Sequence, residues 1–109
     1  MTFRVLALFF AVTGCAGRLA RAESQFRDGR YPDAKNTLVT LEPESRSWTD
    51  GARAEYALYR GLTHASLGDG DQASVWLREA KAIESAHPGS LSQEDAQRLK
   101  LGLDNIGSE

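Results

Sequence analysis

The chain has 109 residues, of which 41% are hydrophobic and 26% charged, and this composition is typical of one globular domain. Its 13 Lys and Arg and 15 Asp and Glu residues give a formal net charge of −2, which argues against nucleic-acid binding because that function needs excess positive charge. One Cys and two His residues cannot form an internal disulfide or supply the ligands of a zinc site. We therefore expect no nucleic acid and no metal.

Residues 1–14 have the three parts of an export signal. Arg4 supplies a positive start, an apolar stretch runs from Val5 to Val12, and the small residues Thr13 and Gly14 follow. An apolar helix of this length covers only ~12 Å, whereas the hydrocarbon layer of a bilayer is ~30 Å thick, so the segment is too short to span it. We expect residues 1–14 to be removed as a signal peptide.

The residues Val12-Thr13-Gly14-Cys15 resemble the lipobox of bacterial lipoproteins, in which an aliphatic and two small residues precede a Cys. The resemblance implies that Cys15 carries a covalent lipid and begins a mature domain of residues 15–109. It further implies the periplasmic side of the outer membrane of a Gram-negative bacterium, because Ala16 stands where enterobacterial inner-membrane lipoproteins often carry Asp. The inner membrane is the less favoured localisation. Alternatively, Cys15 is a small buried residue or follows an ordinary signal peptide.

From residue 16 onward apolar residues recur every three or four positions, which predicts amphipathic helices and no strands. Pro32 suits the first turn of one helix, and we expect Pro43 to end that helix near Glu42. Ser90 and Gln93 have the spacing of a capping box at the start of the last helix. The expected helices cover residues 16–28, 32–42, 49–67, 71–85 and 90–107. The expected core positions are Leu19, Ala22, Phe26, Ala34, Leu38, Leu41, Ala54, Ala57, Leu58, Gly61, Leu62, Ala65, Ala73, Trp76, Leu77, Ala80, Ile83, Ala96, Leu99, Leu103 and Ile106.

Two stretches of the chain are similar at an offset of 39 residues. The stretch from Gly29 to Ala34 aligns with the stretch from Gly68 to Ala73, and a Leu follows four residues after each Ala. This pattern resembles the tetratricopeptide repeat, although the usual period is ~34. The resemblance implies an all-α fold with two helical hairpins, at about 16–43 and 48–88, and a capping helix at about 90–107. Its structural positions are Gly29, Ala34, Gly61, Gly68, Ala73 and Ala80.

In that family the first helix of each repeat lines a groove that binds peptides. The resemblance therefore implies that Glu55, Leu58, Tyr59 and Leu62 face a partner groove. Aromatic side chains are favoured in interfaces because they bury a large area at low entropic cost. Alternatively, Tyr56 and Tyr59 pack between helices.

Catalytic motifs are not found around the two His residues. His64 is expected on a helix and His87 in a loop, and neither accompanies a nucleophile motif. The stretch Asp69-Gly70-Asp71 lacks the later ligands of a calcium loop and is better interpreted as a turn with a helix cap. We predict no catalytic residue.

We therefore expect a lipid-anchored, periplasm-facing helical-repeat protein that binds another envelope protein or peptide and helps to assemble it. A small envelope enzyme, or an accessory subunit of one, is one alternative. A soluble secreted helical domain is the other.

Overall fold

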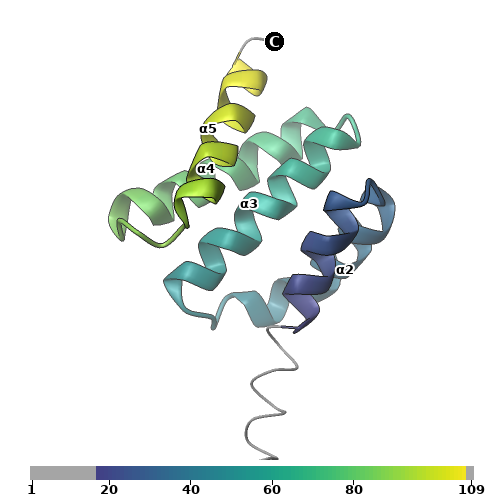
Figure 1. The fold of residues 1–109 in the computed structure, drawn as a ribbon, viewed down its shortest axis with the longest axis horizontal. Helices are drawn as coiled ribbons and strands as arrows, with labels where there is room; N and C mark the ends of the chain where they lie inside the picture. Colours follow the sequence, from purple (N-terminus) through teal and green to yellow (C-terminus); the bar gives the residue numbers. More distant parts are fainter. Residues whose placement is uncertain (1–16, 108–109) are drawn as a thin grey trace, which may run out of the picture.

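The computed structural model describes residues 17–107 as an all-helical fold, which confirms the all-α part of the prediction (Figure 1). In this range there are five helices and no strand. The N-terminal helix covers residues 17–27, and it is followed by α2 (Tyr31–Ser45), α3 (Asp50–Ser66), α4 (Gly70–Ala86) and α5 (Gln93–Gly107). The predicted signal peptide and Cys15 lie outside the described residues.

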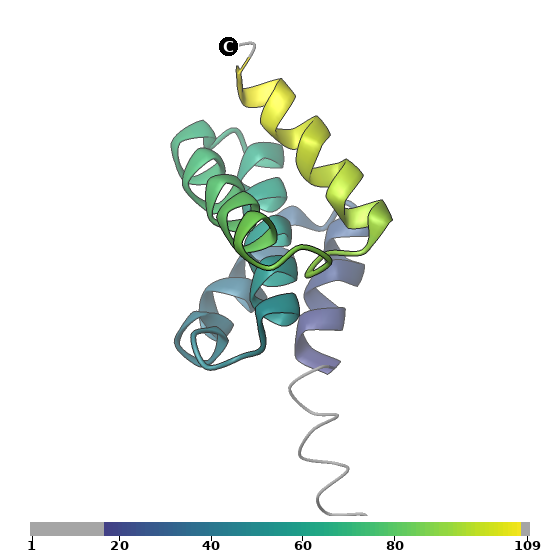
Figure 2. The same ribbon diagram turned by 90° about the vertical axis from the view of Figure 1, so that its left-hand side faces the viewer.

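Helix α3 is at the centre of the arrangement. It contacts α2, α4 and α5, and Tyr59 in α3 packs against Phe26 of the N-terminal helix. Figure 2 shows α2 and α4 on one side of α3, and the N-terminal helix and α5 on the other. Two different surfaces therefore flank α3, and each is built by three helices.

Side chains cap the first turns of three helices. Thr49 and Asp69, at the starts of α3 and α4, each accept a hydrogen bond from the main-chain N–H three residues further on. At the start of α5, Ser92 accepts the equivalent bond, at 3.1 Å. The predicted cap, Ser90, lies two residues too early. Its hydroxyl donates instead to a main-chain carbonyl in the turn before α5.

Helix α2 continues through Pro43, so the predicted end near Glu42 is wrong. A Pro in a helix lacks the N–H that would bond the carbonyl four residues earlier. Because α2 ends only two residues after Pro43, the loss is confined to its last turn. In that turn the hydroxyl of Ser45 donates to the carbonyl of Glu42 at 2.7 Å.

The core lies around α3, and most of the core positions expected from the apolar pattern belong to it. Helices approach closely only where small residues line the contact, and Gly61 is such a place: an added Cβ would lie 2.7 Å from Cγ of Leu77 in α4. Ala65 is exposed and is the one expected core position that lies outside the core. The buried core positions are Leu19, Ala22, Ala34, Leu38, Leu41, Ala54, Ala57, Leu58, Gly61, Ala73, Leu77, Ala80, Ile83 and Leu99, and those partly buried against them are Phe26, Leu62, Trp76, Ala96, Leu103 and Ile106.

Glu84, near the end of α4, holds the turn that leads to α5. Its two carboxylate oxygens accept the main-chain N–H groups of Leu91 and Gly89, each at 2.9 Å. These hydrogen bonds hold the pKa of the Glu84 carboxyl below its ordinary value. Leu91 is buried in the core, so the turn is fixed at both ends. Glu84 and Leu91 thus help to fix the position where α5 begins.

Candidate functional site

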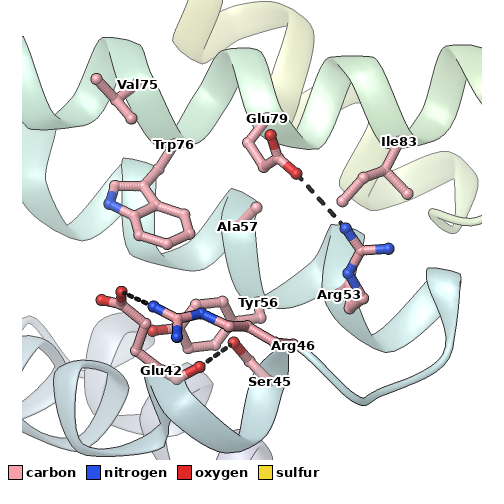
Figure 3. Close-up of a pocket in the computed structure, with 10 residues that line it drawn as sticks. All are labelled: Glu42, Ser45, Arg46, Arg53, Tyr56, Ala57, Val75, Trp76, Glu79 and Ile83. Carbon is pink, nitrogen blue, oxygen red and sulfur yellow. Dashed lines mark hydrogen bonds and ion pairs between the residues drawn. The ribbon is translucent and has the colours of Figure 1, made fainter.

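A cleft of about 280 Å³ lies between α2, α3 and α4. We call it the α2–α4 cleft. Figure 3 shows the aromatic side chains at its centre and charged side chains around them. Its lining residues are Glu42, Ser45, Arg46, Arg53, Tyr56, Ala57, Val75, Trp76, Glu79 and Ile83.

Aromatic rings stack edge to face at the floor of the α2–α4 cleft, where Tyr56 and Trp76 line the cleft and Trp48 packs behind Tyr56. The ring centroid of Tyr56 lies 5.6 Å from that of Trp76 and 5.9 Å from that of Trp48. The guanidinium carbon of Arg60 lies 4.3 Å from the centroid of Trp76, at cation–π distance. At the rim, Val75 is 58% exposed. The cleft therefore combines a rigid aromatic floor with an apolar edge that is open to solvent.

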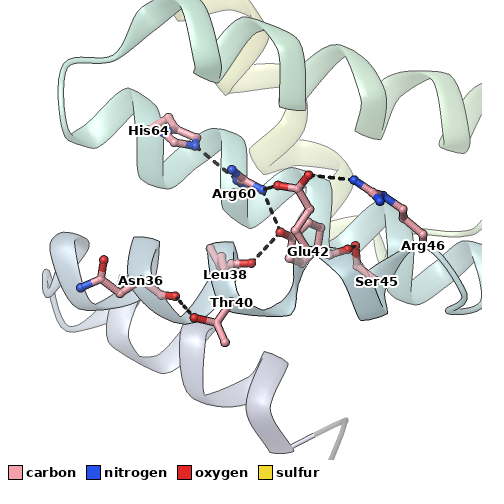
Figure 4. A network of polar contacts seen from close by, with 9 residues as sticks. Asn36, Leu38, Thr40, Glu42, Ser45, Arg46, Arg60 and His64 are labelled. Carbon is pink, nitrogen blue, oxygen red and sulfur yellow. Dashed lines mark hydrogen bonds and ion pairs between the residues drawn. The ribbon is translucent and has the colours of Figure 1, made fainter.

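A buried arginine organises the polar side chains below the α2–α4 cleft (Figure 4). Arg60, in α3, forms an ion pair with Glu42 of α2 and donates to the hydroxyl of Tyr56 at 3.0 Å. That hydroxyl donates in turn to the carbonyl of Leu38 at 2.6 Å. The hydrogen bond from Arg60 holds the pKa of Glu42 below its ordinary value, whereas burial raises the pKa of Tyr56. This network joins α2 to α3.

His64 lies at the other end of the same network, and it is buried rather than on an open helix face. Its Nε2 accepts from Nε of Arg60 at 3.4 Å, while its buried Nδ1 has no hydrogen-bond partner among the described residues. Burial, together with the charge of Arg60, lowers the pKa of His64. Its nearest carboxylate, Asp69, lies 3.8 Å from Nδ1. Neither neighbour is a nucleophile that an imidazole base activates, so these contacts do not form a catalytic pair.

A second hollow, of about 560 Å³, lies on the other side of α3, next to the N-terminal helix and α5. We call it the α3–α5 groove. None of its lining residues carries a charge, so it offers no titratable group for acid–base chemistry. They are Phe26, Leu62, Ala65, Ser66, Gly68, Gly70, Gly102, Asn105 and Ile106.

The four residues predicted to face a partner groove are placed differently from one another. Leu62 lines the α3–α5 groove, and Glu55 is half-buried. Leu58 and Tyr59 are 0% and 1% exposed, so a partner cannot reach their side chains in this structure. The pattern of α3 does not reveal this burial, which for Tyr59 comes from Phe26 of the N-terminal helix and Asp95 of α5. Tyr56 and Tyr59 are both buried between helices, as the alternative interpretation expected.

Three carboxyl side chains, of which Glu23 and Asp95 are buried and Glu55 is half-buried, lie where the N-terminal helix meets α3 and α5. The sequence did not single them out. Glu23 shares a hydrogen bond with Glu55, and Asp95 of α5 lies close by. Burial raises the pKa of Glu23 to about 8, and the neighbouring Glu55 and Asp95 charges act in the same direction. The only sequence signal here was the spacing of Glu23 and Arg27, which do pair, at 3.3 Å.

Four other residues singled out from the sequence are Cys15, His87, Gly29 and Gly68. Cys15, the predicted lipidation site, falls outside the described residues. His87 is exposed after α4, with its Nδ1 3.4 Å from an oxygen of Asp50. The predicted repeat positions Gly29 and Gly68 lie in turns with φ of +78° and +81°, which favours glycine.

Searches of protein-family models, curated proteins and solved structures give no match to the chain. Between residues 17 and 107, no helix has both the length and the apolar character needed to cross a bilayer. In the same range, no three His, Cys, Asp or Glu side chains gather as a metal site requires. The geometry described above is therefore the ground for a functional proposal.

Proposed function

We propose that this chain is a non-catalytic helical-repeat module, held on the periplasmic side of the outer membrane by a lipid on Cys15, that binds another envelope protein. The partner docks in the α2–α4 cleft. The observation that carries the proposal is the composition of this cleft, which presents Trp76, Arg46 and Arg53 beside an exposed Val75, while the buried Tyr56 supports Trp76 from below. Trp and Arg are among the residue types that contribute most of the binding energy in many protein interfaces.

The geometry of the cleft supports docking of a protein. The ring stacking of Trp48, Tyr56 and Trp76 holds the floor in place before a partner arrives, which reduces the entropy lost on binding. Arg53, on the opposite side of the cleft, is about one-third exposed, and its two terminal nitrogens each lie 3.6 Å from a carboxylate oxygen, of Asp50 and of Glu79, at the edge of ion-pair distance. Its guanidinium therefore keeps donors for a partner at the polar rim of an apolar centre.

The repeat assignment is supported by burial at equivalent positions. Ala34 and Ala73, which are 39 residues apart, are both fully buried, and so are Leu38 and Leu77. Leu41 and Ala80, the next equivalent positions in the two repeats, are fully buried as well. Gly61 packs against α4 as the small residue of a close hairpin does. This regularity favours two stacked hairpins with α5 as a cap.

The anchor rests on the sequence alone, through the export signal and the lipobox-like residues before Cys15. Several acyl chains hold a protein on a membrane far better than one. Mass spectrometry of the natively processed protein tests this part. An acylated Cys15 at the mature N-terminus supports the anchor, whereas an unmodified N-terminus at another residue overturns it and favours the soluble secreted alternative.

Photocrosslinking in living cells tests the docking site. A photoreactive residue at Val75 is expected to form an adduct with one envelope protein, whereas the same residue at exposed Lys81, on α4 outside the cleft lining, is not. Adducts from Ala65 alone, in the α3–α5 groove, would overturn the assignment to the cleft.

Matched charge substitutions provide the control. Val75→Glu places a charge on the apolar rim and is expected to abolish co-purification of the crosslinked partner, while Lys81→Glu leaves it unchanged. Both positions are exposed, so both variants keep the helical circular dichroism of the parent. Equal retention of the partner by the two variants contradicts the proposal. The enzyme alternative gains support only if a turnover is found that substitution of His64 or His87 abolishes without unfolding.

A further inference from the structure

The N-terminal helix is attached to α3 through an interface that contains two carboxyl groups. Glu23 is 7% exposed and shares a hydrogen bond with Glu55 of α3. One turn further along, the rings of Phe26 and Tyr59 pack 5.7 Å apart. The carboxyl pair therefore lies inside the contact that holds this helix, on the side of α3 opposite to the α2–α4 cleft.

A hydrogen bond between two carboxyl groups requires that one of them keeps its proton, because ionised carboxylates only accept. The surrounding charges do little to replace that proton. Arg27 contacts Glu23 at 3.3 Å, but its side chain is 55% exposed, so water screens its charge. The nearby Asp95 is another negative charge, already bound by the hydroxyl of Tyr59 and by Arg98.

We propose that the proton shared by Glu23 and Glu55 is a pH-sensitive latch that holds the N-terminal helix against α3. Loss of this proton leaves two negative charges facing each other beside Asp95 in a buried interface, and the helix then detaches from α3. The latch goes beyond the partner binding proposed above and operates whether or not a partner is present. Because Phe26 is part of the α3–α5 groove, detachment also removes one wall of that groove.

The direction of the pH dependence follows from proton linkage. In the docked helix burial raises the pKa of Glu23 to about 8, and in the detached helix Glu23 returns toward its ordinary value of 4.5. Between these two values the docked form binds more protons, so docking weakens as the pH rises. A difference of one proton makes the opening constant rise by up to tenfold per pH unit, and the rise stops above about pH 8.

Hydrogen exchange of the natively processed protein measures this opening. Exchange rates of amides 21–27, divided by their intrinsic rates, are expected to increase by up to tenfold per pH unit between about pH 5 and pH 8. The amides of α4 serve as the internal reference and are expected to stay more protected. An absence of pH dependence in amides 21–27, or identical protection and slope in α4, would overturn the latch.

Two substitutions separate the latch from general effects of charge. Glu23→Gln keeps a neutral side chain of the same size and is expected to remove the pH dependence while leaving the helix docked. Glu44→Gln removes an exposed carboxylate that also contacts this helix, through Arg18, and is expected to retain the dependence. A slope that persists in Glu23→Gln contradicts the proposal.

A direct titration keeps the proposal testable if Glu23→Gln does not fold. The carboxyl ¹³C signal of Glu23 in the unsubstituted protein, followed by nuclear magnetic resonance, is expected to titrate near pH 8. A midpoint near 4.5 overturns the latch. Neither outcome depends on the α2–α4 cleft, so failure of the latch and failure of partner docking are distinguishable.

Discussion

Replacement of Gly61 by Ala tests a close contact between α3 and α4. The added Cβ would lie 2.7 Å from both Cγ and Cδ2 of Leu77, and 3.0 Å from its main-chain N. Rotation of Leu77 cannot relieve the contact with the main chain, so the two helices must separate. Overpacking of this kind costs about 1–3 kcal/mol, while Ala gains about 1 kcal/mol over Gly in a helix interior. We expect Gly61→Ala to lower the free energy of unfolding by about 1 kcal/mol.

Gly102→Ala is the matched control for this substitution. Gly102 is also buried within a helix, but its added Cβ would lie 3.2 Å from methyl groups of Leu62 and Leu77, which need to shift by only a few tenths of an ångström, and no main-chain atom lies as close as at Gly61. We therefore expect Gly102→Ala, with the same gain in helix propensity, to be more stable than Gly61→Ala.

Urea unfolding followed by circular dichroism measures both glycine variants, and thermal unfolding should show a melting temperature about 4–8 °C lower for Gly61→Ala. If Gly61→Ala is as stable as Gly102→Ala, the close approach of α3 to α4 is refuted.

Three further predictions concern polar contacts, each measured by urea unfolding. Thr49→Ala removes the cap of α3 and is expected to cost about 1 kcal/mol, and an unchanged midpoint would show that water replaces the cap. Tyr56→Phe removes the hydroxyl that accepts from the buried Arg60 and donates to the carbonyl of Leu38, and it is expected to cost about 1–3 kcal/mol; a neutral result would contradict the network of Figure 4. Because the folded pKa of His64 is lowered, the unfolded chain binds more protons below pH 6.5, and stability is expected to fall as the pH drops through that value. His64→Gln is expected to reduce this dependence of stability on pH. The comparison is made in a Glu23→Gln background, because the raised pKa of Glu23 changes stability in the opposite direction. An unaltered dependence would exclude His64 as its source.

The number and order of the helices could be predicted from the sequence because helix formation leaves a local pattern. Leu38 and Leu77 recur on apolar stripes, and both are fully buried. Thr49 and Asp69 precede such stripes and do cap them. The ends of the helices were harder to predict. A Pro near the end of a helix, such as Pro43, removes only one hydrogen bond and so need not end the helix.

The contents of the candidate sites could not be predicted, because they depend on how helices distant in the sequence cross. The pattern of α3 places Tyr59 on an apolar face but does not say that Phe26 and Asp95 cover it. Likewise, Glu23 has the sequence spacing of an exposed i,i+4 pair with Arg27. Only the packing against Glu55 turns it into a carboxyl that keeps its proton.

The carboxylate of Glu84 has a consequence for the shape of the whole molecule. Residues 87–92 are not helical. The two hydrogen bonds that Glu84 accepts from main-chain N–H groups in this segment tie it to the end of α4. A shorter or uncharged side chain at this position releases both N–H groups, so that the start of α5 is then held by the packing of this helix against α3 and α4.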